Sequence, residues 1–270
     1  MRVVARKHRS TGATAAAVGD VRRTPDTQLP AHRTPPKCDA SDRSMTMLSP
    51  SPLAVVSDLA TAPDVSVVIP FYRAQSTLGR ALASVAAQTQ PVQEVIIVDD
   101  ASGPEAAAVL ARIVSDWPHL AAKIVTLPAN AGAGAARNAG WAASAGAFVA
   151  FLDADDAWHP RKIEIQSHYL RNHDEVDVCG HAHCHALAQQ LQADASPVPD
   201  DLATLFRAAS ANIGRFSILL RNPFVTPSVM LRRDLAQRFD DGQRHMEDHR
   251  LWMRMVLSGV RVRRLGLALV

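Results

Sequence analysis

Three carboxylates follow an apolar run in the segment FLDADDAW, residues 151–158. Asp153, Asp155 and Asp156 repel one another at this spacing, and burying them without a partner costs free energy. In an extended segment Asp153 and Asp155 project to the same side, because side chains alternate with a period of two. Such a pair suits Mg²⁺ or Mn²⁺, which take oxygen ligands and keep bound waters. The alternative is a solvated acidic turn that caps the next helix, which has Pro160 in its first turn.

A glycine-rich stretch at residues 130–140, NAGAGAARNAG, offers groups that bind anions. Arg137 stands at the head of a predicted helix, where backbone N–H groups and the guanidinium can both face an anion. Gly132 and Gly134 fit a dinucleotide fingerprint, but Arg137 occupies the place of its third glycine. On its own the stretch is therefore equally compatible with a tight turn and close helix packing.

Two further acidic pairs stand beside predicted elements. Asp99 and Asp100 end the apolar run EVIIVDD. Glu247 and Asp248 lie in the predicted first turn of a helix in the segment HMEDHRLWMRMVL. The helix dipole keeps a carboxylate ionised there, although acids are common in first turns for purely structural reasons.

Alternating strands and helices are predicted to hold these side chains in place. Apolar runs predict buried strands at 64–72 and 94–100, a third short strand at 122–127 and a fourth strand at 147–156. Helices are predicted at 76–89, at 104–116 and after the glycine-rich turn. This alternation predicts an α/β fold with a mostly parallel central sheet flanked by helices. Ligands bind such sheets beyond the carboxyl ends of the strands, where two of the acidic clusters stand.

The composition of the 270-residue chain is that of a globular protein, with 47% apolar residues and a formal net charge of +3. So small an excess gives no reason to expect nucleic acid as a partner. Residues 1–62, rich in Ala, Arg, Thr, Ser and Pro, predict a disordered N-terminal leader before a domain at 63–270. Three cysteines without disulfide spacing indicate a reducing compartment. No apolar run reaches the roughly 18–20 residues of a membrane helix, so we expect no transmembrane segment in this chain.

Taken together, the motifs resemble those of the family 2 glycosyltransferases, nucleotide-sugar-dependent enzymes of the GT-A fold. The resemblance covers about residues 64–268 and rests on several segments: VSVVIPFY, EVIIVDDASG, NAGAGAARNAG, FLDADDAWHP, NPFVTPSVMLRR and MEDHRLW. Each segment alone could arise by chance, whereas all of them in order and at workable spacing are specific.

The resemblance implies a nucleotide site at the end of the first strands. Pro70, which is expected to stop the first strand, and Tyr72 lie where the family's nucleotide binds. Asp99 and Asp100 fall on the V-D-D motif, one of whose aspartates accepts a hydrogen bond from the base. Arg137 falls on the A-R-N motif beside the nucleotide and its diphosphate.

The resemblance also implies the metal ligand and the catalytic base. Asp153 and Asp155 fall on the D-x-D motif, with Asp155 as the metal ligand and Asp153 nearer the ribose. Glu247 and Asp248 fall on the E-D pair, whose aspartate serves as the catalytic base. A divalent cation and donors are needed because the diphosphate of the sugar nucleotide carries two negative charges.

The implied reaction is transfer of a sugar from a nucleoside diphosphate sugar, a UDP-sugar, to a hydroxyl group, with Mn²⁺ or Mg²⁺ and with inversion. The acceptor would be a glycan, a lipid-linked molecule or a protein, and the location cytoplasmic or peripheral at the inner face of the membrane. One alternative is a catalytically silent nucleotide-sugar-binding domain of the same fold. The other is a nucleotidyltransferase, which would need a Lys near the first strand, where this chain has PFYRAQST. Because the sequence stops at Val270 in a predicted strand, we expect it to be truncated before residues that close the acceptor site.

Two other groups of residues are expected to have no catalytic role. The segment CGHAHCHAL, residues 179–187, lacks a recognised zinc spacing and predicts an edge strand. Its His183 or His185 would then face the acceptor cleft. Trp158 and Trp252 are expected to pack in the core rather than to stack on a sugar.

Deletion of residues 1–62 is expected to leave the thermal midpoint and the nucleotide affinity unchanged, because a segment without apolar periodicity adds nothing to the core. Calorimetry and a nucleotide titration on the full and shortened chains measure both quantities. A large fall in the melting temperature of the shortened chain would show that the segment belongs to the core.

Overall fold

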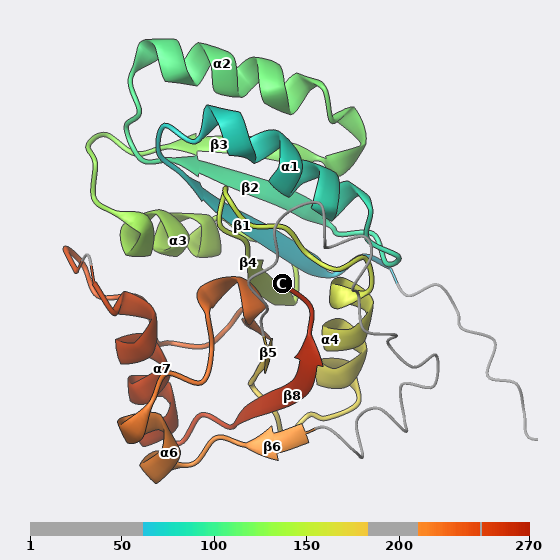
Figure 1. The fold of residues 1–270 in the computed structure, drawn as a ribbon, viewed down its shortest axis with the longest axis vertical. Helices are drawn as coiled ribbons and strands as arrows, with labels where there is room; N and C mark the ends of the chain where they lie inside the picture. The colour runs from blue at the N-terminus through green and yellow to red at the C-terminus, as the bar shows by residue number, and fades with distance from the viewer. Residues whose placement is uncertain (1–61, 183–209, 244) are drawn as a thin grey trace, which may run out of the picture. The chain divides into compact units, whose positions relative to one another are not determined.

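The computed structural model describes residues 62–182, 210–243 and 245–270 (Figure 1). The predicted N-terminal leader therefore lies, apart from Ala62, outside the described residues. The strands are β1 Val65–Phe71, β2 Glu94–Asp99, β3 Ala122–Thr126, β4 Phe148–Phe151, β5 Val178–Ala182, β6 Ser210–Asn212, β7 Met230–Arg232 and β8 Val262–Ala268. The α-helices are α1 Gln75–Ala86, α2 Pro104–Ser115, α3 Ala133–Ala142, α4 Lys162–Arg171, α6 Arg215–Leu220 and α7 Glu247–Leu257. Among them, no helix is both long and apolar enough to cross a membrane.

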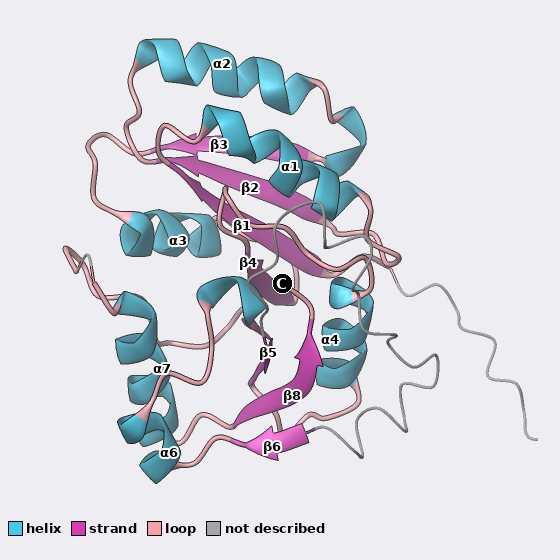
Figure 2. Ribbon diagram, in the orientation of Figure 1, coloured by secondary structure: helices cyan, strands magenta, loops and turns pink. Residues whose placement is uncertain are grey.

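The strands form one sheet in the order β3-β2-β1-β4-β7-β5-β8-β6 (Figure 2). The first four neighbours, β3 to β4, are parallel to one another. Strand β7 is antiparallel to both β4 and β5, β8 is parallel to β5, and β6 is antiparallel to β8. The predicted α/β fold with a mostly parallel sheet and flanking helices is confirmed.

Both faces of the central strands β1, β2 and β4 are buried, which explains their near-continuous apolar sequences. On one face Val67 and Ile69 of β1 belong to a cluster with Leu78 and Leu82 of α1. On the other face Val68 belongs to a cluster with aromatic side chains of α3 and α7, Trp141 and Trp252. Side chains of one strand alternate between the two clusters because their period is two.

The two tryptophans named in the sequence analysis pack in the core, as expected. Trp252 is 1% exposed and Trp158 is 5% exposed. The Trp158 indole N–H donates a hydrogen bond to the Pro227 carbonyl at 2.9 Å.

The prediction that Pro70 ends the first strand is wrong, because β1 continues to Phe71 and Pro70 pairs with Val98 of β2. Leu152 donates its N–H to the Val68 carbonyl, so the backbone groups of Val68 face β4. Pro70, two residues on, faces the same way, but the pairing of β1 with β4 stops at Val68 and Phe151. The missing N–H of the proline therefore costs no hydrogen bond.

Two other element predictions need correction. The fourth strand ends at Phe151 rather than at residue 156, and the acidic segment after it is a turn in which Asp156 donates its N–H to the Asp153 carbonyl at 3.1 Å. Strand β5 lies between β7 and β8 rather than at an edge. His181 on β5 is fully buried, while His183 and His185 lie outside the described residues.

Helix α3 lies unusually close to β1. A Cβ atom on Gly140 would lie 2.3 Å from Cγ1 of Val68 and 3.1 Å from Cγ2 of Val98. Only a residue without a side chain fits this approach, which sets how near α3 and its Arg137 lie to the sheet.

Gly140→Ala is expected to lower the free energy of unfolding by about 1–3 kcal/mol, because the added methyl group overpacks the contact with Val68. Gly79→Ala is the matched control, since Gly79 lies inside α1 with no atom within 4 Å of an added Cβ. That variant should be as stable as the parent or more stable by about 0.5–1 kcal/mol. Urea unfolding measures both; equal stabilities for the two variants would contradict the proposed role of Gly140.

Candidate active site

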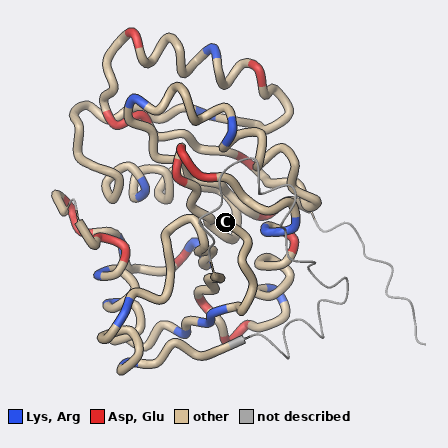
Figure 3. Tube along the Cα trace, viewed as in Figure 1, with Lys and Arg blue, Asp and Glu red and all other residues tan. Residues whose placement is uncertain are grey.

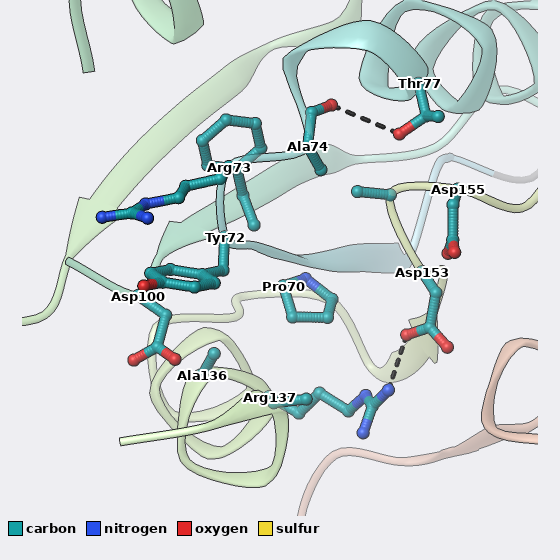
Figure 4. A pocket seen from close by; sticks show the side chains of 13 residues that line it. Pro70, Tyr72, Arg73, Ala74, Thr77, Asp100, Ala136, Arg137, Asp153 and Asp155 are labelled. Atoms are coloured by element: carbon teal, nitrogen blue, oxygen red, sulfur yellow. Dashed lines mark hydrogen bonds and ion pairs between the residues drawn. The ribbon is translucent and has the colours of Figure 1, made fainter. Parts of the chain in front are cut away.

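A pocket of about 470 Å³ lies at the carboxyl ends of β1, β2 and β4 (Figure 4). This is the size of a pocket for a small ligand. Six of the residues selected from the sequence line it: Pro70, Tyr72, Asp100, Arg137, Asp153 and Asp155. The rest of the lining consists of Phe71, Arg73, Ala74, Thr77, Ala133, Ala136 and Ala154. Asp99 and Asp248, also selected from the sequence, are not among the lining residues.

Arg137 is a buried charged group of the pocket, with 4% of its surface exposed. Its Nη2 donates to Oδ1 of Asp153 at 2.6 Å, and its Nη1 donates to Oε1 of Glu247 at 3.2 Å. Burial by itself lowers the pKa of Arg137, but the charges and hydrogen bonds of the two carboxylates outweigh it and raise this pKa. The guanidinium therefore stays charged, and its Nε has no hydrogen-bond partner among the described residues.

The two aspartates at the end of β2 have different surroundings. Asp100 accepts the backbone N–H groups of Ala131 at 2.7 Å and Gly132 at 2.9 Å, so it ties β2 to the glycine-rich turn. Asp99 is 1% exposed and accepts the N–H of Ser102 at 3.0 Å. Asp100 therefore meets the pocket directly, whereas Asp99 holds the turn that follows β2.

The D-x-D aspartates meet the pocket from a turn, not from the predicted extended segment. Asp153 is bound to Arg137, as Figure 4 shows. The Asp155 carboxylate forms no hydrogen bond or ion pair with any residue that the structure describes, while its backbone carbonyl accepts a hydrogen bond from Arg80 of α1. The turn thus leaves one carboxylate available to a ligand.

The carboxylate oxygens of the pocket fit a divalent cation that would also be bound by the diphosphate of a nucleotide sugar. No group of three or more His, Cys, Asp or Glu side chains that could hold a metal ion occurs in the described part of the chain. Asp155, with the second oxygen of Asp153, would supply oxygen ligands, and the remaining ligands would come from the diphosphate and water. Mg²⁺ is commonly held in this way, by one or two carboxylates plus phosphate oxygens.

Glu247 and Asp248 point to different partners. Glu247 binds Arg137, which connects α7 to the pocket. Oδ2 of Asp248 accepts a hydrogen bond from Nδ2 of Asn222 at 2.9 Å. Asp248 is therefore the chain neighbour of Glu247, which contacts the pocket residue Arg137. Its own carboxylate is oriented by Asn222, in the segment that follows α6.

Backbone strain adjoins the site. Arg73, Ala101 and Met246 have left-handed φ angles of 51°, 55° and 54°, which are costly for residues with a side chain. Each is a chain neighbour of a site residue: Tyr72, Asp100 and Glu247. Such strain is typical of functional sites, where the surrounding structure must hold it.

Sequence reasoning missed several polar contacts of this site. Arg73 lines the pocket and lies with its guanidinium 5.2 Å from the centre of the Tyr72 ring. The pairing of Arg137 with Glu247 joins residues 110 positions apart, and Asn222 is joined to Asp248 across 26 positions. Of these contacts, only that of Arg73 with Tyr72 could have been expected from the sequence, because the two residues are adjacent.

The sequence model described as Glycosyl transferase family 2 matches residues 66–235, more than half of the chain. The chain belongs to glycosyl transferase family 2. Membership confirms the family that the motifs predict, in place of the nucleotidyltransferase alternative.

Two solved structures and one curated relative illustrate the similarity. The succinoglycan biosynthesis protein ExoO of Rhizobium meliloti (strain 1021) is 30% identical over 172 residues, which are 64% of this chain and 44% of that protein. The crystal structure of S. aureus TarS 1–349 in complex with UDP-GlcNAc has a TM-score of 0.60 at 23% identity and covers 76% of this chain and 57% of that one. The mannosyltransferase PcManGT from Pyrobaculum calidifontis, in complex with GDP-Man and Mn²⁺, has a TM-score of 0.56 at 19% identity, with 76% and 55% covered. The structural likenesses confirm the GT-A fold of this family 2 domain, which spans 44% of ExoO and 55–57% of the chains of the two solved structures.

Asp155→Ala is expected to abolish the dependence of UDP binding on Mn²⁺, because it removes the one pocket carboxylate without a partner among the described residues. Titration calorimetry with UDP, with and without Mn²⁺, measures this dependence. Asp156→Ala is the matched control, since Asp156 is the next acid of the same turn and does not line the pocket. Equal UDP affinity with and without Mn²⁺ in the parent protein would remove the metal role of Asp155.

Proposed function

We propose that this family 2 domain transfers a hexose from a UDP-sugar to a hydroxyl acceptor, with inversion and with a divalent cation, Mn²⁺ or Mg²⁺. The observation that carries the proposal is the pocket at the ends of β1, β2 and β4, in which Arg137, Asp153 and Asp155 meet. One cation and two carboxylates suit a ligand that is anionic and binds with a metal ion. The UDP-sugar complex of TarS supports the choice of donor.

The nucleotide would lie between the strand ends and the start of α3. That end of α3 has no side-chain cap and no acidic residue in its first turn, and Ala133 at its start lines the pocket. The free backbone N–H groups and the helix dipole favour an anion there. Tyr72 and Asp100 lie close together at one side of the pocket in Figure 4 and would meet the base, while Asp153 would lie nearer the ribose.

Asp155, with Asp153, would hold the cation, which offsets charge on the departing diphosphate. Arg137 has a separate task, since Asp153 and Glu247 keep its guanidinium charged despite its burial. It fixes Asp153, so the donor would meet an arrangement that is already formed.

Asp248 is the proposed base. As the acceptor oxygen bonds to the anomeric carbon and the bond to the diphosphate breaks, the hydroxyl proton would pass to the Asp248 carboxylate. The attack comes from the face opposite the leaving group, which inverts the configuration. Asn222 would keep the carboxylate turned toward the acceptor. Because Asp248 lies outside the pocket lining, a silent nucleotide-sugar-binding domain is the alternative that an experiment must separate.

The acceptor is proposed to be a growing glycan, free or lipid-linked, rather than a protein. The role of ExoO in succinoglycan biosynthesis supports a polysaccharide. The proposed location is the cytoplasm, at the inner face of the membrane where the acceptor is lipid-linked. The proposed extent of the domain is residues 63–270.

Asp248→Asn is expected to lower turnover by about 10²-fold or more with donor affinity kept, because the amide cannot accept the hydroxyl proton. Donor turnover and UDP affinity are measured on the same preparation. Asp241→Asn is the matched control, an exposed aspartate in the loop before α7. Near-parental turnover in Asp248→Asn with normal UDP binding would exclude Asp248 as the base and leave a structural role in the first turn of α7.

A further inference from the structure

Helix α6 exposes three large apolar side chains. Phe216, Leu219 and Leu220 are 86%, 55% and 86% exposed, and their spacing of three and four residues places them on one face of the helix. Ile218 is fully buried and anchors the opposite side. We call Phe216, Leu219 and Leu220 the α6 face. A contiguous group of exposed apolar side chains marks an interaction surface.

Arginines without ion pairs in the described part of the chain stand at both ends of α6 and on β8, the strand paired with β6. Arg215 and Arg221 are exposed at the two ends of α6. Arg263 and Arg264 of β8 pair in register with β6, the strand that leads into α6. None of these four arginines has an ion pair within the described ranges, and Figure 3 shows Lys and Arg along α6 and β8.

Arginines on α7 and just before β8 do form ion pairs. Arg250 and Arg254 of α7 both bind Asp240, and Arg261 binds Asp177. Uncompensated positive charge therefore stands at both ends of α6 and on β8, whereas the arginines of α7 and the residue before β8 are paired. Apolar side chains bordered by unpaired arginines complement a surface that has an apolar interior and anionic groups on its outside.

The α6 face is held in a fixed place beside α7. The Nε2 of His249 lies 2.7 Å from the Ile218 carbonyl, so His249 donates to the backbone of α6. Two residues after α6 ends, Asn222 binds Asp248. The exposed side chains are thus presented by a packed helix, one short loop away from the proposed base.

We propose that the α6 face docks this domain on an anionic phospholipid bilayer. Phe216, Leu219 and Leu220 insert at the boundary between headgroups and acyl chains, and the flanking arginines contact lipid phosphates. Each arginine near an anionic surface adds attraction that falls off within a Debye length, so binding weakens as salt rises. Docking here brings the bilayer next to Asp248, where a lipid-linked acceptor would present its sugar. The docking itself does not depend on the proposed transfer reaction.

Sedimentation of the full chain with vesicles tests the proposal. We expect binding to vesicles of phosphatidylcholine and phosphatidylglycerol in equal parts, and at least about tenfold weaker binding to phosphatidylcholine alone. The triple variant Phe216→Ser, Leu219→Ser, Leu220→Ser should lose at least about tenfold in binding to the mixed vesicles. Ile124→Ser on β3, at the opposite edge of the sheet, removes an exposed apolar side chain and should bind like the parent.

A second pair of variants separates the charge contribution. Arg215→Gln with Arg221→Gln should weaken binding to the mixed vesicles and reduce its salt dependence, whereas Arg112→Gln on α2 should leave binding almost unchanged.

Equal vesicle binding by the parent and the triple variant would overturn the proposal. So would a parent that binds no vesicles but forms a dimer that the triple variant loses, since the α6 face would then contact a second copy. Neither donor nor acceptor is used, so such a failure would leave the transferase proposal standing.

Discussion

One buried guanidinium holds three segments of this domain around the pocket. Arg137 lies on α3, and its two hydrogen-bonded carboxylates come from the turn after β4 and from the start of α7. Removing a charge from water is costly, and two opposing charges at hydrogen-bond distance offset that cost. Loss of either carboxylate would leave a buried cation less well compensated. The relative position of the D-x-D turn and α7 therefore depends on this pair of contacts.

The position of the guanidinium depends in turn on how α3 reaches the sheet. Gly140 lets the helix approach β1 at a distance that no other residue allows. Asp100 holds the turn that begins the same helix by accepting two of its N–H groups. The backbone of α3 is thus held near one end by close packing at Gly140 and at the other by the Asp100 carboxylate. Arg137 lies between these two points, so its side chain is already placed to reach Asp153 and Glu247. A site built this way is formed before any ligand arrives.

The parallel half of the fold and most of the pocket could be predicted from sequence, because apolar runs that end in aspartate show both the strands and the edge where they converge. The turn at Asp153–Asp156 could not, since local sequence did not show where β4 would stop. The place of β5 inside the sheet depends on β7 and β8, which are distant in sequence. The contact of Arg137 with Glu247 is invisible for the same reason. Pro70 was misjudged because its tolerance depends on where a neighbouring strand ends.

A second buried cation shows by contrast why the pocket uses arginine. Lys162 on α4 is fully buried, donates to Oε1 of Gln166 at 2.5 Å and lies 4.1 Å from the centre of the Trp158 ring. Burial without a carboxylate partner lowers the pKa of Lys162 from 10.5 to about 7. Between these two values the unfolded chain binds a proton that the folded chain releases, so this group makes folding more favourable as the pH rises. A neutral amine still donates to Gln166 and keeps α4 in place, but it could not hold Asp153 and Glu247. Where charge itself must persist in a dry environment, a guanidinium between two carboxylates is the solution that remains.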